Sequence, residues 1–177
     1  IPVSSPKIRQ VIVDFEDYKQ FQQAMEGCEI VFCSVGTTQA KVKGDMQAYR
    51  KVDYDIPVNA ARFASDLGCR HFLLVSSVGA DANSSNFYLK LKGEVENEIS
   101  AFVLPAFSVF RPSMLLGQRS EFRLGERIGQ FLMKALSFLI PSKYKPIEAA
   151  DVALAMVNAS LKPSITGKTI FEYKEMR

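Results

Sequence analysis

The sequence predicts an α/β fold in which a doubly wound parallel sheet carries helices on both faces. Short continuous apolar runs, typical of strands that are buried on both faces, alternate along the chain with helical patterns. The 177 residues are 47% hydrophobic and 23% charged, as expected of one compact domain. No internal repeat, low-complexity tract or linker divides them, so we expect a single domain over residues 1–177.

The first predicted elements are a strand, a helix and a strand. Residues 7–15 end in the β-branched run Val11-Ile12-Val13, which predicts a buried strand. Residues 16–26 place their apolar side chains on one helical face before Gly27 ends the pattern. Residues 30–36 are a second apolar run of strand type. This alternation begins the parallel sheet.

The middle of the chain continues the same alternation. A long helical pattern covers residues 45–67, with a break expected at Pro57. Residues 71–77 are a third continuous apolar strand, and a polar loop separates them from the helical pattern of residues 87–99. Residues 107–112 are a fourth strand, which a proline stops.

The last part of the chain contains two more predicted helices and one strand. Residues 121–139 are mostly helical in pattern, and 149–161 are an alanine-rich helix. Residues 168–173 are a last short strand. The whole pattern therefore supplies helices for both faces of the sheet.

Polar or small residues stand where the predicted strands end, and parallel sheets bind ligands at that edge. The strand ends are Asp14, Val35-Gly36-Thr37, Ser76-Ser77 and Pro112-Ser113. Gly36 lets a backbone approach a ligand closely, and Asp14 could accept hydrogen bonds from an adenine amine. Any one of these is more often an ordinary strand terminator, but four at one edge favour a binding crevice.

Tyr88 and Lys92 are the candidate catalytic pair. Their spacing of four places both side chains on one face of a helix, where a lysine ammonium favours the phenolate and makes tyrosine an acid/base. Ser77, at a strand end, could hydrogen-bond the same reacting oxygen. Chance alone gives about 0.4 Tyr-x-x-x-Lys matches in such a chain, so a half-buried aromatic beside a solvated lysine is the alternative interpretation.

Several longer segments resemble one family. They are Val13-Asp14-Phe15, Gly36-Thr37-Thr38, Lys51-Val52-Asp53, Cys69-Arg70-His71-Phe72, Ser76-Ser77, Gly79-Ala80-Asp81, Ser84-Ser85-Asn86-Phe87, Lys92-Gly93-Glu94-Val95-Glu96 and Val109-Phe110-Arg111-Pro112. The sequence resembles the atypical, extended short-chain dehydrogenases/reductases, and is especially similar to the Tat-interacting-protein oxidoreductase family. The matching segments span most of the first 125 residues.

The resemblance implies a Rossmann-like NAD(P)-binding fold, related to nucleoside-diphosphate-sugar epimerases, with NADP as cofactor and NAD as the alternative. It implies that Tyr88 is the proton donor and acceptor, that Lys92 binds the nicotinamide ribose, and that Ser77, more than Ser76, orients the substrate oxygen. It also implies which residues contact the cofactor: Asp14, Phe15, Val35, Gly36, Tyr88, Lys92, Leu115 and Arg123.

One departure from the family pattern is clear. The family begins with a strand, a glycine-rich turn, a helix and a second strand, whereas the ten glycines here never cluster and no strand precedes Lys7. The cofactor pyrophosphate would sit at that helix N-terminus. Since the chain also starts with Ile1 rather than methionine, we expect that it lacks its N-terminal quarter through design, proteolysis or disorder, and binds a dinucleotide poorly. The alternative is a minimal domain that never had this unit.

Composition excludes several other classes. The net charge of +3 is too small and too dispersed for a nucleic-acid or membrane-surface protein, and the longest apolar run includes Lys134 and is too short to span a bilayer. The three cysteines lack metal-ligand spacing, so no metal site is expected, and their number favours a reducing, cytoplasmic location. His71 is the single histidine and has no carboxylate spacing for Ser-His-Asp hydrolysis.

The functional prediction is an NAD(P)-dependent oxidoreductase that acts on a carbonyl or alcohol through Tyr88, Lys92 and Ser77. Alternatives are a nucleotide-sugar epimerase or dehydratase, and a dinucleotide-sensing interaction protein with little turnover. The expected partner is a small-molecule substrate, and a homodimer is a further expectation. Residues 113–146 would form the variable, substrate-side segment, but the sequence does not name the substrate.

Overall fold

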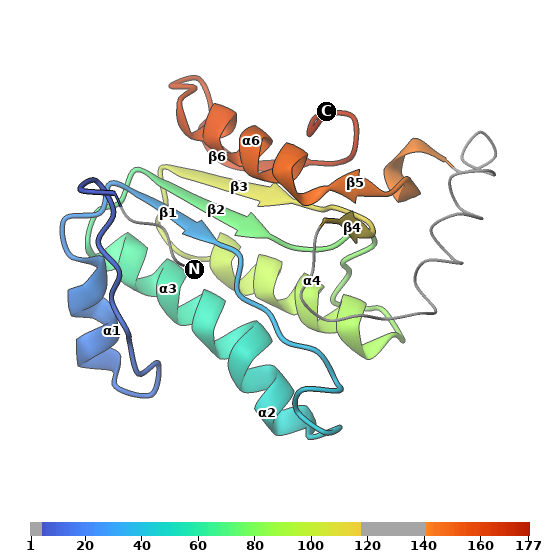
Figure 1. The fold of residues 1–177 in the computed structure, drawn as a ribbon, viewed down its shortest axis with the longest axis horizontal. Coiled ribbons are helices and arrows are strands. Elements are labelled where there is room, and N and C mark those ends of the chain that lie inside the picture. Colours follow the sequence, from blue (N-terminus) through green and yellow to red (C-terminus); the bar gives the residue numbers. More distant parts are fainter. Residues whose placement is uncertain (1–4, 118–140) are drawn as a thin grey trace.

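The computed structural model describes residues 5–117 and 141–177. Its main sheet has four parallel strands in the order β1-β2-β3-β6. They are β1 (Ile30–Cys33), β2 (His71–Val75), β3 (Ala106–Phe110) and β6 (Gly167–Phe171). All four were predicted, the first three from their apolar runs and β6 as a short strand at 168–173, and their carboxyl ends lie at the same edge of the sheet (Figure 1). The fold is the predicted parallel α/β arrangement.

Helices cover both faces of this sheet, so the expected doubly wound architecture is confirmed (Figure 1). One face carries α1 (Tyr18–Met25), α3 (Ile56–Asp66) and α4 (Phe87–Ser100), while α6 (Ala149–Ser160) covers the other. A short helix α2 (Met46–Arg50) and a π-helical turn η1 (Lys51–Asp55) precede α3 without interruption. Among the described residues, no helix has the length and apolar character needed to cross a bilayer.

Two apolar clusters form the core, one on each face of the sheet. Alternate residues of β2 divide between them, because successive side chains of a strand point to opposite faces. Phe72 and Leu74 pack on the α3–α4 side with Phe63, and Leu73 packs on the α6 side with Val152. The continuous apolar run that predicted β2 therefore reflects burial on both faces.

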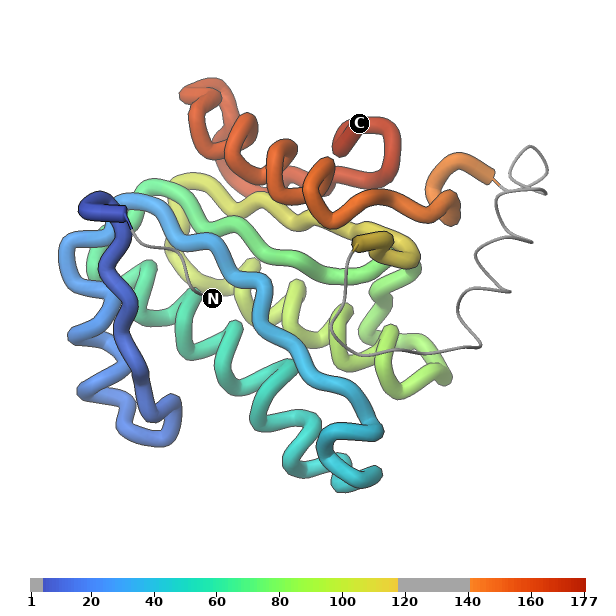
Figure 2. Tube along the Cα trace, in the orientation of Figure 1, coloured from blue at the N-terminus to red at the C-terminus, as the bar shows by residue number. Residues whose placement is uncertain are grey.

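The strand predicted at 7–15 is wrong. These residues pair with none of the described strands, and they run along α1, where Phe15 packs edge-on against Phe21 with 4.8 Å between ring centroids (Figure 2). Ile12 is 98% exposed. A β-branched run provides strand propensity, but a strand forms only where a neighbouring strand accepts its hydrogen bonds.

The helix break predicted at Pro57 is also wrong. Proline has no N–H to donate to the carbonyl of Asp53, one α-helical turn earlier, and its ring needs room there. The chain widens by one residue instead: Ile56 N–H bonds to the carbonyl of Lys51, five residues back. The helical path from Met46 to Asp66 therefore continues through a π turn.

A two-stranded parallel sheet, which periodicity did not predict, joins the ends of the substrate-side segment. It consists of β4 (Leu115–Leu116) and β5 (Ile147–Glu148), with a 3₁₀ turn η2 (Ser142–Tyr144) shortly before β5. Two-residue strands are too short to leave a periodic signal. The helix predicted at 121–139 lies outside the described residues.

His71 makes stability depend on pH. It is buried at the start of β2, with Nε2 2.8 Å from Ser108 Oγ, and burial together with nearby Arg70 lowers its pKa below the ordinary 6.5. Between the two pKa values the unfolded chain binds more protons than the folded one, so stability decreases as the pH falls below about 6.5. Urea denaturation at about pH 7.5 and about pH 5.5 should show a loss of up to about 1 kcal/mol that a His71→Gln variant lacks. Equal losses in both proteins would contradict this origin.

Candidate active site

Helix α4 carries the candidate acid/base and its lysine. Asn86 caps the helix by accepting the Leu89 N–H at 3.1 Å, so Tyr88 falls in the first turn and Lys92 one turn later. Tyr88 is 37% exposed, whereas Lys92 is buried, with its Nζ 5.8 Å from the centroid of the Tyr88 ring. The phenol is thus open to a ligand, and the ammonium lies beneath it.

Gly93 allows α4 to lie directly against the loop that follows β2. A Cβ at this position would lie 2.2 Å from the Ala82 nitrogen and 2.3 Å from the Asp81 carbonyl carbon. The backbones also bond, because the Asp81 N–H donates to the Leu89 carbonyl at 3.1 Å. This contact joins the helix of Tyr88 and Lys92 to the loop that begins with Ser76 and Ser77.

Asp53 is the ionic partner of Lys92. The Lys92 Nζ lies 3.0 Å from Asp53 Oδ1, and both side chains are almost completely buried. Asp53 Oδ2 accepts the backbone N–H of Thr37 at 2.7 Å. One carboxylate on η1 therefore contacts both α4 and the turn that follows β1.

Gly36 completes this contact from the end of β1. It is exposed, and a Cβ there would lie 3.4 Å from Asp53 Oδ1. The structure thus brings Gly36 and Lys92, two residues predicted to bind the cofactor, to the same carboxylate. Val35, just before Gly36, is partly buried against the core.

The two serines after β2 have different surroundings. Ser76 donates its hydroxyl to the buried carboxylate of Glu96 at 2.5 Å, so its proton is engaged within the fold. Ser77 Oγ lies 3.4 Å from the carbonyl of its neighbour Val78, which is a long and weak hydrogen bond. The Ser77 hydroxyl is therefore the easier of the two to redirect toward a substrate oxygen.

Glu96 is the centre of a second buried ion pair on α4. Arg111, just after β3, donates to it twice, with Nε–Oε1 at 3.0 Å and Nη2–Oε2 at 2.5 Å. The hydrogen bond to Glu96 raises the pKa of Arg111, and Lys168 of β6 lies 3.9 Å from the same carboxylate. Tyr88, Lys92 and Glu96 are spaced by four, so one stripe of α4 holds the phenol and both ion pairs.

A second phenol, Tyr49 of α2, lies close to the site but is buried. Its ring packs edge-on against Phe87, with centroids 5.7 Å apart. Burial, and then the charge of Asp53 and the neighbouring Tyr88, raise the pKa of Tyr49 to about 12. Because the Tyr49 ring is buried whereas Tyr88 is 37% exposed, Tyr88 is the better candidate for proton transfer to a bound substrate.

The residues predicted beside the adenine lie in a separate cavity. Asp14 and Phe15 line a space of about 700 Å³ together with Lys51 and Asp55 from η1, whereas Val35 and Gly36 lie outside its lining. Leu115 is in β4, partly buried against the α6 side of the core. Arg123 lies outside the described residues. The structure thus groups Tyr88, Lys92 and Gly36, but not Asp14 or Leu115, around one set of contacts.

The donors at this edge suit the reactive half of a dinucleotide better than its phosphates. A serine hydroxyl follows the end of β2, and a phenol and an ammonium lie on helix α4, which is joined to the loop after β2; such groups suit the proton transfer that accompanies nicotinamide chemistry. Phosphates prefer helix N-termini with free N–H groups. Three of the described helices use their own caps for those groups: Asp17 on α1, Asp45 on α2 and Asn86 on α4.

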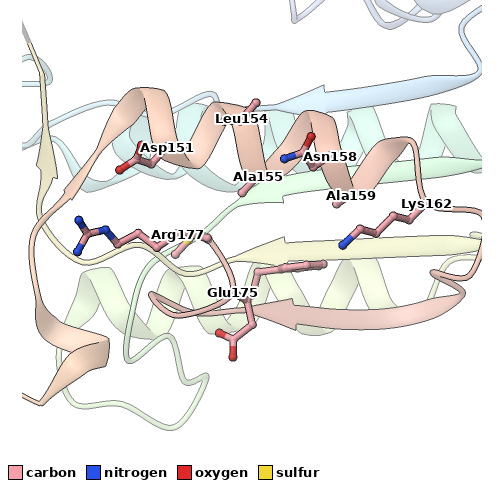
Figure 3. Close-up of a pocket in the computed structure, with 10 residues that line it drawn as sticks. Asp151, Leu154, Ala155, Asn158, Ala159, Lys162, Glu175 and Arg177 are labelled. Carbon is pink, nitrogen blue, oxygen red and sulfur yellow. The ribbon is translucent and has the colours of Figure 1, made fainter.

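Another cavity, of about 390 Å³, lies on the far side of the sheet between α6 and the C-terminal segment (Figure 3). Asp151, Leu154 and Asn158 of α6 line it, with Glu175 and Arg177 from that segment. No predicted site residue is among the described residues that line it. It is therefore separate from the Tyr88–Lys92 site.

Sequence reasoning missed Asp53 and Glu96 as site residues, although both stood in the segments that carried the family resemblance. A signal was present. Asp53 is four residues from Tyr49 and four from Pro57, both of which are buried, so its carboxylate occupies a core-facing position. Glu96 similarly follows Lys92 by four. Buried carboxylates require partners, and such a position marks a paired charge.

Comparison with known proteins identifies the family. Residues 2–163 match a family described as NAD(P)H-binding. The chain is 36% identical over 167 residues to Protein HTATIP2 of Rattus norvegicus, covering 94% of this chain and 68% of that protein. It is 33% identical over 147 residues to "Protein FMP52, mitochondrial" of Debaryomyces hansenii, covering 80% of this chain and 63% of that protein. The chain thus spans about two thirds of the length of these relatives.

Solved structures share the fold at low sequence identity. The Bordetella bronchiseptica enzyme WbmG, crystallised with NAD and UDP, superimposes with a TM-score of 0.65 at 16% identity, covering 92% of this chain and 56% of that one. UDP-N-acetylglucosamine 4-epimerase from Bacillus cereus gives a TM-score of 0.66 at 12% identity, covering 92% and 63%. These similarities confirm the Rossmann-like fold. By its sequence and its architecture, the chain belongs to the NAD(P)H-binding family.

Proposed function

We propose that this protein is an NAD(P)-dependent oxidoreductase of the short-chain dehydrogenase type, which acts on a carbonyl or alcohol and prefers NADP. The observation that carries the proposal is the pairing of an exposed Tyr88 with a buried, ion-paired Lys92 one helical turn away. The family membership supports the cofactor class.

In the proposed reaction, the bound dinucleotide supplies or accepts a hydride, and the chain's own residues manage the proton. The Tyr88 phenol donates a proton to the substrate oxygen during reduction and takes it back during oxidation. The Lys92 ammonium binds the nicotinamide ribose hydroxyls. The Ser77 hydroxyl donates a hydrogen bond to the same substrate oxygen, which holds that oxygen beside Tyr88.

The substrate class follows from the site only in part. The segment 113–146 contains β4, and β5 follows directly after it. The apolar composition of this segment favours a partly apolar substrate. WbmG was crystallised with UDP, and the Bacillus cereus protein is a UDP-N-acetylglucosamine 4-epimerase. UDP-sugars should therefore be included among the substrates tested. Turnover of such a sugar without net cofactor consumption would favour the epimerase alternative.

The test is a Tyr88→Phe substitution. It removes the titrating hydroxyl and keeps the ring, so we expect turnover to fall at least about a hundredfold. NADPH affinity should stay within about twofold, because the ring and Lys92 remain. The measurements are NADPH consumption with a panel of aldehydes, ketones and UDP-sugars, and NADPH binding by fluorescence.

Tyr173→Phe is the matched control. This phenol accepts a hydrogen bond from Arg177 at 3.0 Å in the C-terminal segment, outside the site, so its loss should leave turnover unchanged. Full activity of Tyr88→Phe would exclude the proposed acid/base role. If the wild-type protein binds NADPH, turns over no carbonyl, and changes its affinity for another protein when NADPH is bound, the sensing alternative is correct.

A further inference from the structure

Asp53 connects two parts of the site that are far apart in sequence. One carboxylate oxygen holds the Lys92 ammonium on α4 at 3.0 Å, and the other accepts the Thr37 N–H at the end of β1 at 2.7 Å. The two contacts use different oxygens, so they form together. The Asp53 side chain is 2% exposed and lies between its two partners.

The surrounding backbone is shaped to admit this carboxylate. The π turn η1 places Asp53 on the buried side of the helical path, and π turns occur often at functional sites. Gly36 has no side chain, and a Cβ there would stand 3.4 Å from Asp53 Oδ1, at the near limit of ordinary contact. A widened helix and a glycine thus both make room for the same group.

The Asp53–Lys92 ion pair differs from an ordinary buried ion pair because it connects two segments that are proposed to contact the cofactor. A buried pair often adds little net stability, because the desolvation of two charges offsets their attraction. Here the cation is the residue proposed to bind the cofactor ribose, and the carboxylate's second partner is the turn that would line the cofactor. A lysine has three donor hydrogens, so one can hold Asp53 while the others remain for ribose hydroxyls.

We propose that Asp53 is a positioning residue, whose carboxylate fixes the Lys92 ammonium against the Gly36-Thr37 turn and thereby sets the catalytic helix and the cofactor-side turn in one geometry. The inference rests on the proposed function, in which Lys92 binds the nicotinamide ribose. Asp53 itself does not touch the substrate or the cofactor. It acts through Lys92.

The experiment is a double-mutant cycle read by NADPH affinity. Asp53→Asn keeps an oxygen for the Thr37 N–H but removes the charge that holds Lys92, so the NADPH Kd should rise about tenfold. In a Lys92→Met background the same substitution should change the Kd by less than about twofold, since no ammonium remains to be positioned. Asp53→Glu keeps the charge and should restore most of the affinity.

The outcomes are distinct. An equal rise in Kd on Asp53→Asn in both backgrounds would mean that Asp53 acts without Lys92, and would overturn the proposal. If Asp53→Asn alone does not fold, the double variant compared with Lys92→Met still tests the proposal, because a change in Kd of more than about twofold between them would mean that Asp53 acts without Lys92. Thermal denaturation of each variant separates lost affinity from lost folding.

Asp66→Asn is the matched control. It is the same substitution at an exposed position in the last turn of α3, and it should leave the NADPH Kd unchanged. The readout needs no turnover, so a protein that binds NADPH but reduces no carbonyl would refute the oxidoreductase proposal and still decide the role of Asp53. All variants of Tyr88, Asp53 and Lys92 are compared in the natural full-length protein, where a wild type without NADPH affinity would count against both proposals.

Discussion

Replacing Glu96 by alanine should lower the free energy of unfolding by about 3–5 kcal/mol, because it leaves a partly buried Arg111 without its carboxylate. Two hydrogen bonds from Arg111 and one from Ser76 converge on Glu96, which is 1% exposed. Removing the acceptor therefore leaves several donors unsatisfied at once. Urea denaturation followed by circular dichroism measures the loss.

Two further variants establish that the loss comes from the unpaired charge. Glu98→Ala removes an exposed carboxylate from the same helix and should cost within about 0.5 kcal/mol. The double variant Glu96→Leu/Arg111→Met removes both charges and should be more stable than Glu96→Ala. If the stability loss of the double variant equals the sum of the losses of Glu96→Leu and Arg111→Met alone, Glu96 and Arg111 are not energetically coupled, which would contradict this explanation.

Replacing Gly93 by alanine should destabilise the protein by about 3 kcal/mol or more. The added Cβ would lie 2.2 Å from the Ala82 nitrogen, far inside any allowed contact, and the atoms it meets belong to backbone. Helix propensity works in the opposite direction, since alanine is about 1 kcal/mol better than glycine within a helix. The clash is larger than this gain, so α4 must move away from the loop.

This movement should also affect the site, because Lys92 precedes Gly93 and the loop leads back to Ser77. We expect the Gly93→Ala protein to melt at a lower temperature and to bind NADPH more weakly. Gly117→Ala is the control, because among the described residues a Cβ there meets the Ala149 side chain alone, at an ordinary 3.7 Å. An unchanged melting temperature for Gly93→Ala would show that the helix and the loop are not held in this close contact.

The sequence predicts the central strands β2 and β3 most directly, because burial on both faces leaves continuous apolar runs. Phe72, Leu73 and Leu74 are all fully buried, and their run is unmistakable. Residues 7–15 fail for the complementary reason: Val11-Ile12-Val13 has the propensity of a strand but no strand beside it. Strand propensity depends on the residues of the segment itself, whereas strand pairing depends on whether the fold places another strand beside it.

The candidate site also has a part that the sequence predicts and a part that it does not. Tyr88 and Lys92 could be paired from spacing alone, since a helix fixes the relation between residues four apart. The contacts of Asp53 with Lys92 and Thr37 could not, because they join segments 39 and 16 residues apart and depend on a helix that is not α-helical at that point. Pro57 could have revealed the irregularity, but a proline predicts a break more readily than a widened turn.

The π turn has a consequence for how related chains are compared. It contains one residue more than an α-helix of the same path would need, so the place of Asp53 depends on the number of residues between Asp45 and Gly68 as well as on their identity. Deleting one residue there would restore a regular α-helix along the same path, and the residues beside the deletion would change their angular position around the helix axis. A related chain with a one-residue gap here could therefore keep every side chain of the site, and its aspartate would still not reach its lysine.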